Sequence, residues 1–528
     1  MPTSWLPTRL IHLGGRSQPL RVVETAKMSL GSDRSPVIKY TTLSHCWGTV
    51  DTFKLTSKNR NDLYEAINPS TVPKTYAEAM ETTKNLGLEY IWIDSLCIVQ
   101  DDADDWQHEC AQMAEVYRHG YFNIAALEAT DSDGGCFRQR DPAHLASVVV
   151  ETQWEGQDRC FWVHRAFSDR EAILDEIDNS PLHRRAWVLQ ERHMTPRNLH
   201  FGRKAIFWEC RTVTGCESSD PVKVASLFAI RPRNDQQLPE DGVHFAVWIW
   251  TKILTRYTNT ALTFQSDRFI AISALGREIQ LILRSGSTSK VEYLAGLWEV
   301  FIEHQLMWVS TSPKTAIRIS ENDQLTAPSW SWASLNGPAN LFALPWIYKS
   351  YMVIARVLRH TVVPRSGDPF FGPAIGSKSV LEINGLCWRL TSKRHKKRPY
   401  SLDGAMFYPS WDTKHRSSRI GTASFLLPVL IDQSGDPNLD DLLRGLILQK
   451  VDHLTRSFRR VGTFMIRLKR SPPALPFKSW RARLDRCLEL CLEQKIVWPS
   501  QYDNRPSLST PAHKVWSKAK AHKTIFLE

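Results

Sequence analysis

The sequence lacks the residue patterns of the commonest metal and nucleotide sites. None of its ten cysteines forms a pair separated by two residues, and a structural zinc site needs two such close pairs. Neither Gly14-Gly15 nor Gly134-Gly135 leads into Lys-Ser or Lys-Thr, so no phosphate-cradling loop of the nucleotide-hydrolase type is present. We therefore expect no metal site and no such loop.

Long hydrophobic runs are also missing. The sequence contains no stretch of about 18 apolar residues, the length needed to span a bilayer. Its start, MPTSWLPTRLIHLGG, contains no apolar signal core. These absences predict an intracellular protein with reduced thiols and no membrane span.

Acidic residues are scarce in the last third of the chain. Residues 341–528 contain 32 Lys+Arg and 14 Asp+Glu, a net charge of +18, whereas residues 1–340 contain 35 and 41, a net charge of −6. A basic region can bind nucleic acid or anionic lipid, attract the acidic region, or only aid solubility. No nucleic-acid-binding motif accompanies the charge, so we do not expect nucleic acid as a partner. The one dense run, Lys393–Arg398, is either a solvated loop or a nuclear address. We expect a cytoplasmic protein, or a nuclear one if this run is an address.

The most informative segment is Tyr90–Tyr117, in which an apolar, β-prone run stops at Asp94 and an amphipathic helix follows. Neighbouring segments repeat this alternation. We expect strands at 37–46, 90–93 and 121–127, helices at 73–86 and 104–119, and a hairpin from 199–201 to 205–210. The order strand-helix-strand-helix-strand with short links predicts a parallel, doubly wound sheet.

In the rest of the chain the apolar residues follow other spacings. From about 243 to 310, apolar residues that include Trp248, Leu294 and Trp298 follow a helical spacing, and beyond 340 strand-like runs appear. Because 528 residues exceed one ordinary core, several regions are expected. They are an N-terminal lead at 1–37, an α/β domain at 38–215, a helical middle region at 216–340 and a basic, mixed α/β region at 341–528.

Three blocks of the α/β domain resemble the fungal heterokaryon incompatibility (HET) domain family. They are Tyr40–Gly48 (YTTLSHCWG), Tyr90–Trp106 (YIWIDSLCIVQDDADDW) and Ser180–Arg192 (SPLHRRAWVLQER). Their order and spacing carry the resemblance, and later pieces such as Arg459–Phe464 resemble the longer architecture of many members. His45 departs from the family pattern, in which an aromatic residue often stands at this position.

The resemblance implies a role in fungal nonself recognition, in which fusion of unlike hyphae triggers cell death. It implies a protein partner, either the product of a nonself allele or a second copy of the chain. It also implies a flavodoxin-like parallel sheet similar to that of Toll/interleukin-1 receptor (TIR) domains. Some members of that group cleave NAD with a glutamate, so NAD would be a substrate here.

Six residues form the candidate site. They follow the first two strands or belong to the third block: Ser44, Trp47, Gly48, Asp94, Gln190 and Glu191. Parallel strands bring their carboxyl ends to one edge of the sheet, where ligands bind in open α/β folds. With NAD as substrate, Glu191 or Asp94 would be catalytic and stabilise an oxocarbenium-like centre as nicotinamide leaves. The other four would bind the nucleotide. Trp47 would stack on one of its rings, and Gly48 would let the protein backbone approach it closely.

These residues also have structural interpretations. Glu191 would be a buried ion-pair partner, and Trp47 and Trp187 would be core residues. Asp94 would cap its loop or pair with an arginine of the third block: Arg184, Arg185 or Arg192.

Two further sets of residues suggest chemistry less specifically. Cys97 would be a nucleophile with His45 or His183 as its base, or else a small buried residue, which we favour. An acidic run precedes the second helix: Asp101, Asp102, Asp104 and Asp105. It lacks the alternating ligand spacing of a calcium loop, and carboxylates at a helix start cap free N–H groups. We therefore expect caps.

Three functions remain open on the sequence. The domain is an NAD-cleaving enzyme gated by self-association, or a non-enzymatic module that recruits a protein partner. In the third alternative the basic C-terminal region binds nucleic acid.

Overall fold

The computed structural model describes residues 5–15, 18–28, 38–49, 53–139, 147–164, 175–217, 219–223, 242–286, 291–319, 327–341, 351–364, 367–370, 378–390, 400–402, 405–413, 424–432, 441–451, 455–468 and 522–527. The chain forms two compact units. The first comprises Met1–Gln236 and Thr260–Glu278, and the second Gln237–Asn259 and Ile279–Glu528.

A nine-stranded mixed sheet organises the first unit, in the order β11-β10-β9-β8-β5-β3-β4-β1-β2. Its strands are β1 (Arg9–His12), β2 (Arg21–Glu24), β3 (Tyr40–Ser44), β4 (Tyr90–Trp92), β5 (Phe122–Ala126), β8 (Arg197–Phe201), β9 (Ile206–Cys210), β10 (Val213–Cys216) and β11 (Ser219–Lys223). The central strands β4, β3, β5 and β8 run parallel, with Thr41 opposite both Ile91 and Phe122. Antiparallel strands extend the sheet on both sides.

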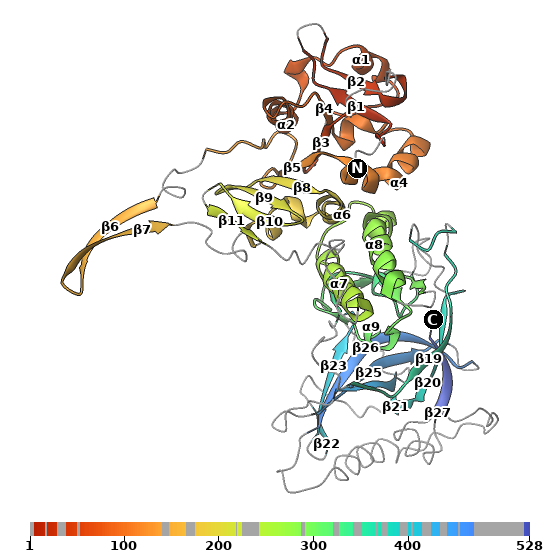
Figure 1. The fold of residues 1–528 in the computed structure, drawn as a ribbon. Helices are drawn as coiled ribbons and strands as arrows, with labels where there is room; N and C mark the ends of the chain where they lie inside the picture. The colour runs from red at the N-terminus through yellow and green to blue at the C-terminus, as the bar shows by residue number, and fades with distance from the viewer. Residues whose placement is uncertain are drawn as a thin grey trace. The chain divides into compact units, whose positions relative to one another are not determined.

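Helices connect the parallel strands (Figure 1). The α-helices of this unit are α1 (Arg60–Glu65), α2 (Lys74–Asn85), α3 (Asp94–Cys97), α4 (Ala103–His119) and α6 (Ala186–Met194). Its 3-10 turns are η1 (Thr25–Lys27), η2 (Pro69–Thr71), η4 (Leu182–Arg184) and η5 (Gln265–Arg268).

The helix boundaries follow from local chemistry. Helix α2 begins directly after Pro73, whose ring fixes φ near the helical value, and ends before Gly87, which adopts a left-handed φ of 76°. Helix α4 begins at Asp102, whose carboxylate accepts the backbone N–H groups of Asp104 and Asp105 at 3.0 and 3.2 Å. The predicted capping role of the acidic run is therefore confirmed for Asp102.

A buried arginine fastens strand β1, which lies between β4 and the edge strand β2, to the rest of the unit. Arg9 is 6% exposed and donates to the Cys97 carbonyl at 2.9 Å. It also forms an ion pair with Asp105, whose carboxylate accepts the Val99 backbone N–H at 2.8 Å. Asp105 is therefore a structural partner of Arg9 rather than part of a cation site.

The predicted α/β character of the N-terminal region is confirmed. The alternation of strands and helices between residues 37 and 127 occurs as expected, and so does the hairpin, which β8 and β9 form. The sheet is mixed rather than wholly parallel, because strands at both of its ends run antiparallel to their neighbours. Strands β1 and β2 lie in the segment predicted as a lead, and the four domain boundaries stay predictions.

Strands β6 (Ser147–Trp154) and β7 (Gln157–His164) form a separate two-stranded sheet, drawn as the orange ribbon in Figure 1. In its register Val150 lies opposite Phe161, and Trp154 opposite Gln157. The apolar side chains of Val150, Phe161 and Trp154 are 41%, 42% and 59% exposed. Since side chains alternate between the faces of a ribbon, these three share one face.

The second unit begins with helices. They are α7 (Gly242–Tyr257), α8 (Ile270–Gly286), which starts in the first unit, and the single turn α9 (Ile302–Gln305). Between α8 and α9, β12 (Tyr293–Leu294) pairs with β13 (Leu297–Trp298). After α9, β14 (Val309–Ser310) pairs with β17 (Ala339–Asn340), and β15 (Ile317–Arg318) pairs with β16 (Leu335–Asn336), which directly follows the 3-10 turn η6 (Trp332–Ser334). The helical interpretation of Leu294 and Trp298 is therefore wrong.

The packing of large rings explains that error. Trp298 is fully buried and lies 5.0 Å from Tyr293 and 6.0 Å from Trp250 between ring centroids. The Gly296 carbonyl between β12 and β13 accepts the indole N–H groups of Trp250 and Trp332, both at 3.0 Å. A hairpin thus inserts its aromatic residues into the core, and the spacing of apolar residues alone does not distinguish it from a helix.

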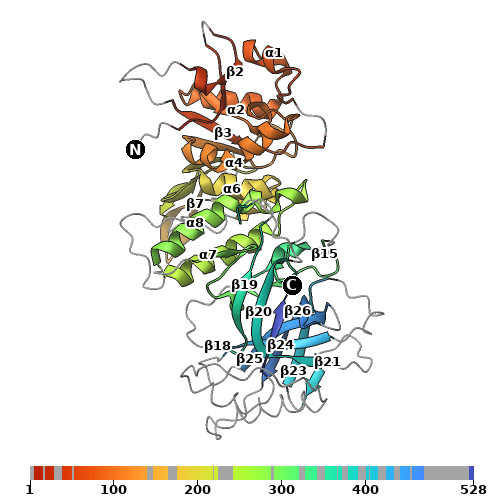
Figure 2. The ribbon, with the colours of Figure 1, turned by 90° about the vertical axis from the view of Figure 1, so that its right-hand side faces the viewer.

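A ten-stranded sheet follows (Figure 2). Its strands are β18 (Tyr351–Val353), β19 (Arg356–Thr361), β20 (Val380–Leu386), β21 (Trp388–Leu390), β22 (Tyr400–Leu402), β23 (Ala405–Trp411), β24 (Ser424–Asp432), β25 (Asp441–Lys450), β26 (Ser457–Leu468) and β27 (His522–Leu527). The long strands β24, β25 and β26 pair antiparallel in sequence order. Every element described beyond residue 341 is a strand, and the strand-like runs predicted near 350, 380 and 462 are confirmed.

Candidate functional site

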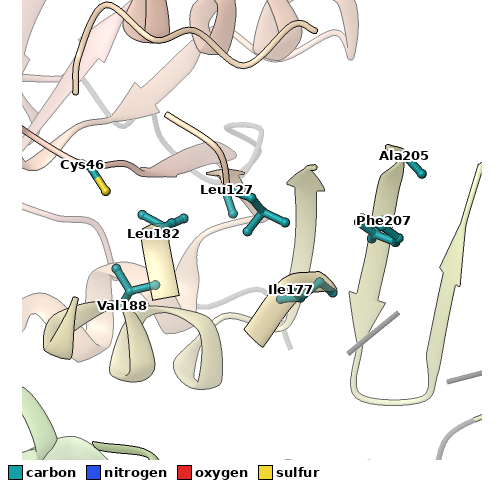
Figure 3. Packing of buried hydrophobic residues seen from close by; sticks show 8 residues of the cluster. Cys46, Leu127, Ile177, Leu182, Val188, Ala205 and Phe207 are labelled. Carbon is teal, nitrogen blue, oxygen red and sulfur yellow. The ribbon is translucent and has the colours of Figure 1, made fainter. Parts of the chain in front are cut away.

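The candidate site lies at the carboxyl edge of the parallel strands. Strand β3 ends at Ser44, β4 ends at Trp92 just before Asp94, and helix α6 carries Glu191. An apolar cluster with members on β5, η4, α6 and β9, and with Cys46 just beyond β3, supports this edge (Figure 3). Its members are Cys46, Ala125, Leu127, Ile177, Leu182, Val188, Ala205 and Phe207. The cluster fixes helix α6 against the ends of β3 and β5.

Glu191 is buried and bonded to Ser44. The Ser44 hydroxyl donates to Glu191 Oε2 at 2.5 Å, and Glu191 is only 3% exposed. The Asn123 amide on β5 donates to Ser44 Oγ at 3.0 Å, which orients the hydroxyl. Burial raises the pKa of Glu191 to about 7, against the opposing effects of Arg185 and of hydrogen bonds from Ser44 and Tyr117. Glu191 therefore changes its charge near neutral pH.

Asp94 lies nearer the surface. Its side chain is 16% exposed, and its Oδ2 accepts the Trp47 indole N–H at 2.9 Å. Its Oδ1 accepts the backbone N–H of Ser95 at 2.8 Å. Among the described residues Asp94 forms no hydrogen bond or ion pair with Arg184, Arg185 or Arg192, so the arginine pairing suggested by the sequence is not found. Its neighbours are instead Trp47, Ser95 and His45.

His45 forms a buried polar chain behind Asp94. Its Nε2 lies 3.0 Å from the Tyr76 hydroxyl, which in turn accepts from Ser95 Oγ at 2.9 Å. Its Nδ1 has no hydrogen-bond partner within the described residues and lies 3.8 Å from Asp94 Oδ1. Burial lowers the pKa of His45 to about 4 and raises that of Tyr76 to about 12. Both side chains are therefore neutral at physiological pH.

Gly48 and Gln190 occupy different environments. Gly48 adopts a left-handed φ of 82°, and a Cβ at this position would lie 2.6 Å from the Asp131 Cβ, so only glycine fits without a shift of the backbone. Gln190 is 3% exposed, and its Oε1 accepts the Ala274 backbone N–H of helix α8 at 3.2 Å. The structure thus brings Ser44 to Glu191 and Trp47 to Asp94, whereas Gln190 contacts α8.

Arg192 has partners of its own beneath the edge. It donates to both carboxylate oxygens of Glu209 at 2.7 and 2.9 Å and to Asp178 at 2.7 Å. His200 Nε2 lies 3.1 Å from the same Glu209 carboxylate. This buried network joins α6 to β8 and β9 and explains why Arg192 is not available to Asp94.

Cys97 and Trp187 have structural surroundings. Cys97 is fully buried, and burial raises the pKa of its thiol far above the ordinary value. The thiolate needed for a nucleophile is therefore strongly disfavoured. Trp187 is half-buried, and its indole donates to Asp267 at 3.3 Å. Neither residue takes part in the polar contacts between Ser44 and Glu191 or between Trp47 and Asp94.

The structure adds residues that sequence reasoning did not include in the site: Tyr76, Ser95, Tyr117, Asn123 and Arg185. Asn123 carried the clearest signal, because an amide in the buried strand FNIAA needs partners. Tyr76 and Tyr117 fit the apolar faces of their helices and so resembled ordinary core residues.

The described part of the chain has neither a cluster of metal ligands nor a membrane-spanning helix. That part of the chain contains no group of three His, Cys, Asp or Glu residues arranged to hold a metal ion. It also contains no helix that is both long and apolar enough to cross a bilayer. Lys393–Arg398 lies outside the described residues.

Comparison with known proteins gives one match. Residues 40–191 match the model of a family described as heterokaryon incompatibility protein (HET). No curated protein and no solved structure matches the chain. The matched segment begins at the first residue of β3 and ends at Glu191, so it contains both carboxylates of the site.

Proposed function

We propose that the protein acts in fungal vegetative incompatibility, where recognition of a nonself partner leads to cell death. The observation that carries this proposal is the family match over residues 40–191. The proposed place of action is the cytoplasm, or the nucleus if Lys393–Arg398 serves as an address.

The strand order supports a flavodoxin-like, TIR-like assignment for this domain. Numbered along the chain, the parallel strands β3, β4, β5 and β8 lie in the order 2-1-3-4. This is the beginning of the flavodoxin-like order, whose ligand site lies between the first and third strands. Here those strands are β3 and β5, and Ser44 and Asn123 come from them.

The chemistry proposed for this edge is the hydrolysis of NAD. The bond between the nicotinamide nitrogen and the ribose anomeric carbon breaks with its electron pair on nicotinamide, and water adds to that carbon and loses a proton. The products are nicotinamide, ADP-ribose and a proton. A carboxylate near the anomeric carbon would stabilise its developing positive charge.

The two candidate carboxylates differ in their access to a substrate. Asp94 is partly exposed and held by the Trp47 indole, whereas Glu191 is buried beneath Ser44. This difference favours Asp94 as the group that faces the ribose. Glu191 would not contact the ribose. It would orient the Ser44 hydroxyl and change the net charge at this edge of the sheet.

The test is NAD turnover by the purified full chain over a range of protein concentrations, since self-association would gate the enzyme. We expect Asp94→Asn and Glu191→Gln to lower turnover by at least tenfold. Glu89→Gln is the matched control, because Glu89 is exposed at the opposite, amino end of β4. Absence of turnover by the unmodified protein at every concentration would exclude the enzyme, and full activity of both variants would exclude these residues.

A second candidate function is a protein-interaction module, favoured by the exposed face of the β6–β7 ribbon. Replacement of Val150 and Phe161 by serine removes an apolar cross-strand pair from that face. Replacement of Gln153 and Asp158, which pair on the other face, is the control. Loss of cell death with unchanged NAD turnover in the first variant only would favour the module. Nucleic-acid binding by the basic region remains a third alternative, and it predicts an affinity that falls steeply with salt.

A further inference from the structure

Arg185 is the cation of the candidate edge. It caps the amino end of helix α6, and its guanidinium donates to the His45 carbonyl at the end of β3. Within the described part of the chain, this carbonyl is the only hydrogen-bond or ion-pair partner of the Arg185 side chain. A guanidinium has five N–H donors, and the described residues account for one hydrogen bond of this side chain.

The electrostatic influence of Arg185 reaches several groups at this edge. Burial raises the pKa of Glu191 to about 7, and the positive charge of Arg185 opposes that rise. Burial lowers the pKa of His45 to about 4, and Arg185 contributes to the lowering. Arg185 therefore lies close to the ends of β3 and α6, and no carboxylate of the described residues forms an ion pair with it.

Other arginines of the same unit show what a structural role looks like here. Arg192 forms a bidentate pair with Glu209 and a bond to Asp178, and Arg9 pairs with Asp105. Arg9 and Arg192 are 6% and 4% exposed, whereas Arg185 is only half-buried and has no such carboxylate partner among the described residues. Half-buried guanidinium groups without a carboxylate suit planar, bidentate recognition of phosphate.

We propose that Arg185 binds a phosphate oxygen of the dinucleotide and so selects for ligands that carry a pyrophosphate. This inference rests on the proposed nucleotide site and names the part of the ligand that Arg185 recognises. The nicotinamide riboside half, which has no phosphate, would lie on the side of Trp47 and Asp94. Arg185 is thus a specificity-determining residue, and it takes no part in breaking the bond.

The experiment measures binding of ADP-ribose and of nicotinamide riboside to the full chain by calorimetry. ADP-ribose contains the pyrophosphate and lacks the bond that is cleaved, so no turnover disturbs its titration. Nicotinamide riboside keeps that bond, so its titration is repeated in the Asp94→Asn background, where turnover is lowered. In Arg185→Gln we expect the Kd for ADP-ribose to rise about 10- to 100-fold, the usual loss for a hydrogen bond to a charged group. The Kd for nicotinamide riboside should stay unchanged.

Two matched variants guard against a folding defect. Arg184→Gln makes the same change one residue earlier, at an exposed side chain, and should bind both ligands as the unmodified protein does. Arg185→Lys keeps the charge but loses the paired N–H donors of the planar guanidinium. It should weaken the binding of ADP-ribose but not of nicotinamide riboside, and by less than Arg185→Gln does. Inorganic pyrophosphate should compete with ADP-ribose for the unmodified protein, a measurement that needs no variant.

The outcomes separate this inference from the proposed function. If the unmodified protein binds ADP-ribose and Arg185→Gln binds it equally well, the role of Arg185 is refuted while the nucleotide site stands. Equal weakening of both ligands would also refute it. If the unmodified protein binds neither ligand, the nucleotide site itself is refuted, and the role of Arg185 with it.

Discussion

Replacing Glu191 with glutamine should make the protein more stable above pH 7 and leave its stability nearly unchanged at pH 4.5. The amide has the shape of the acid and can still accept the Ser44 hydroxyl, but it cannot ionise. In the folded protein burial raises the pKa of Glu191 from 4.5 to about 7. The native state therefore binds the proton more tightly than the unfolded state. The stabilisation by this proton is complete below pH 4.5 and is lost as the pH rises through 7.

The size of the expected stability difference follows from the pKa shift of Glu191. A difference between 4.5 and about 7 corresponds to about 3 kcal/mol of unfolding free energy, at about 1.4 kcal/mol for each pH unit. For a unit of this size we expect a difference of roughly 6–12 °C in the midpoint of thermal unfolding. His45 titrates with the opposite sign: burial lowers its pKa to about 4, so its contribution is lost as the pH falls from 6.5. The pH profile of one protein therefore mixes the two groups, and only the difference between Glu191→Gln and the unmodified protein isolates Glu191.

The assay is thermal unfolding of both proteins at half-unit steps from pH 4.5 to pH 8. Glu209→Gln is the matched control, since it changes another buried glutamate of the same unit. Burial alone would raise the pKa of Glu209, but Arg192 and His200 hold it well below its ordinary value. This variant should therefore destabilise the protein by a constant amount from pH 6 to pH 8. A difference between Glu191→Gln and the unmodified protein that stays flat with pH would refute our account of Glu191.

Two further predictions concern the packing of each unit. Gly48→Ala should lower the unfolding free energy by about 1–3 kcal/mol more than Gly87→Ala. Both glycines have a left-handed φ, but only at Gly48 would a Cβ collide, at 2.6 Å from Asp131 Cβ, and equal costs in chemical denaturation would contradict this. In the second unit, Arg460→Met should cost about 3–5 kcal/mol, because Arg460 is fully buried against Asp412 and the carbonyls of Leu306 and Trp308. Arg318→Met, at a side chain that is 22% exposed, should cost less, and the reverse order in thermal unfolding would contradict the assignment.

Much of the N-terminal fold was predictable because local signals and tertiary structure agree there. Pro73 and Gly87 bound a helix of the expected length, and the apolar run before Asp94 forms a central strand. The antiparallel strands at the two sides of the sheet were harder to predict from the sequence. Strand β1 depends on the burial of Arg9 against Asp105, a contact between residues far apart in the chain that no local pattern announces. The Trp298 hairpin depends in the same way on rings from distant segments.

The position of the site was predictable, but the environment of each residue was not. Ser44 and Asp94 follow adjacent parallel strands, and this alone places them at one edge. The sequence could not say which arginine of the third block meets which acid, because Arg185 precedes α6 and Arg192 lies within it, and the fold sets the direction of each. Arg192 turns to Glu209 beneath the edge, whereas Arg185 turns to the end of β3.

The two carboxylates differ in burial, and this difference favours different roles for them. Asp94 is partly exposed and fixed by Trp47 and Ser95, so it can face a ligand. Glu191 is buried and changes charge near pH 7, so the net charge around Arg185 changes with it. When Glu191 is neutral, the full charge of Arg185 is available to an anion, and when Glu191 ionises, part of that charge is offset. Anion binding at Arg185 should therefore weaken as the pH rises through 7, and this weakening should be absent from Glu191→Gln. Glu191, one of the two acids that the sequence suggested for catalysis, would then act by controlling how strongly the edge attracts phosphate.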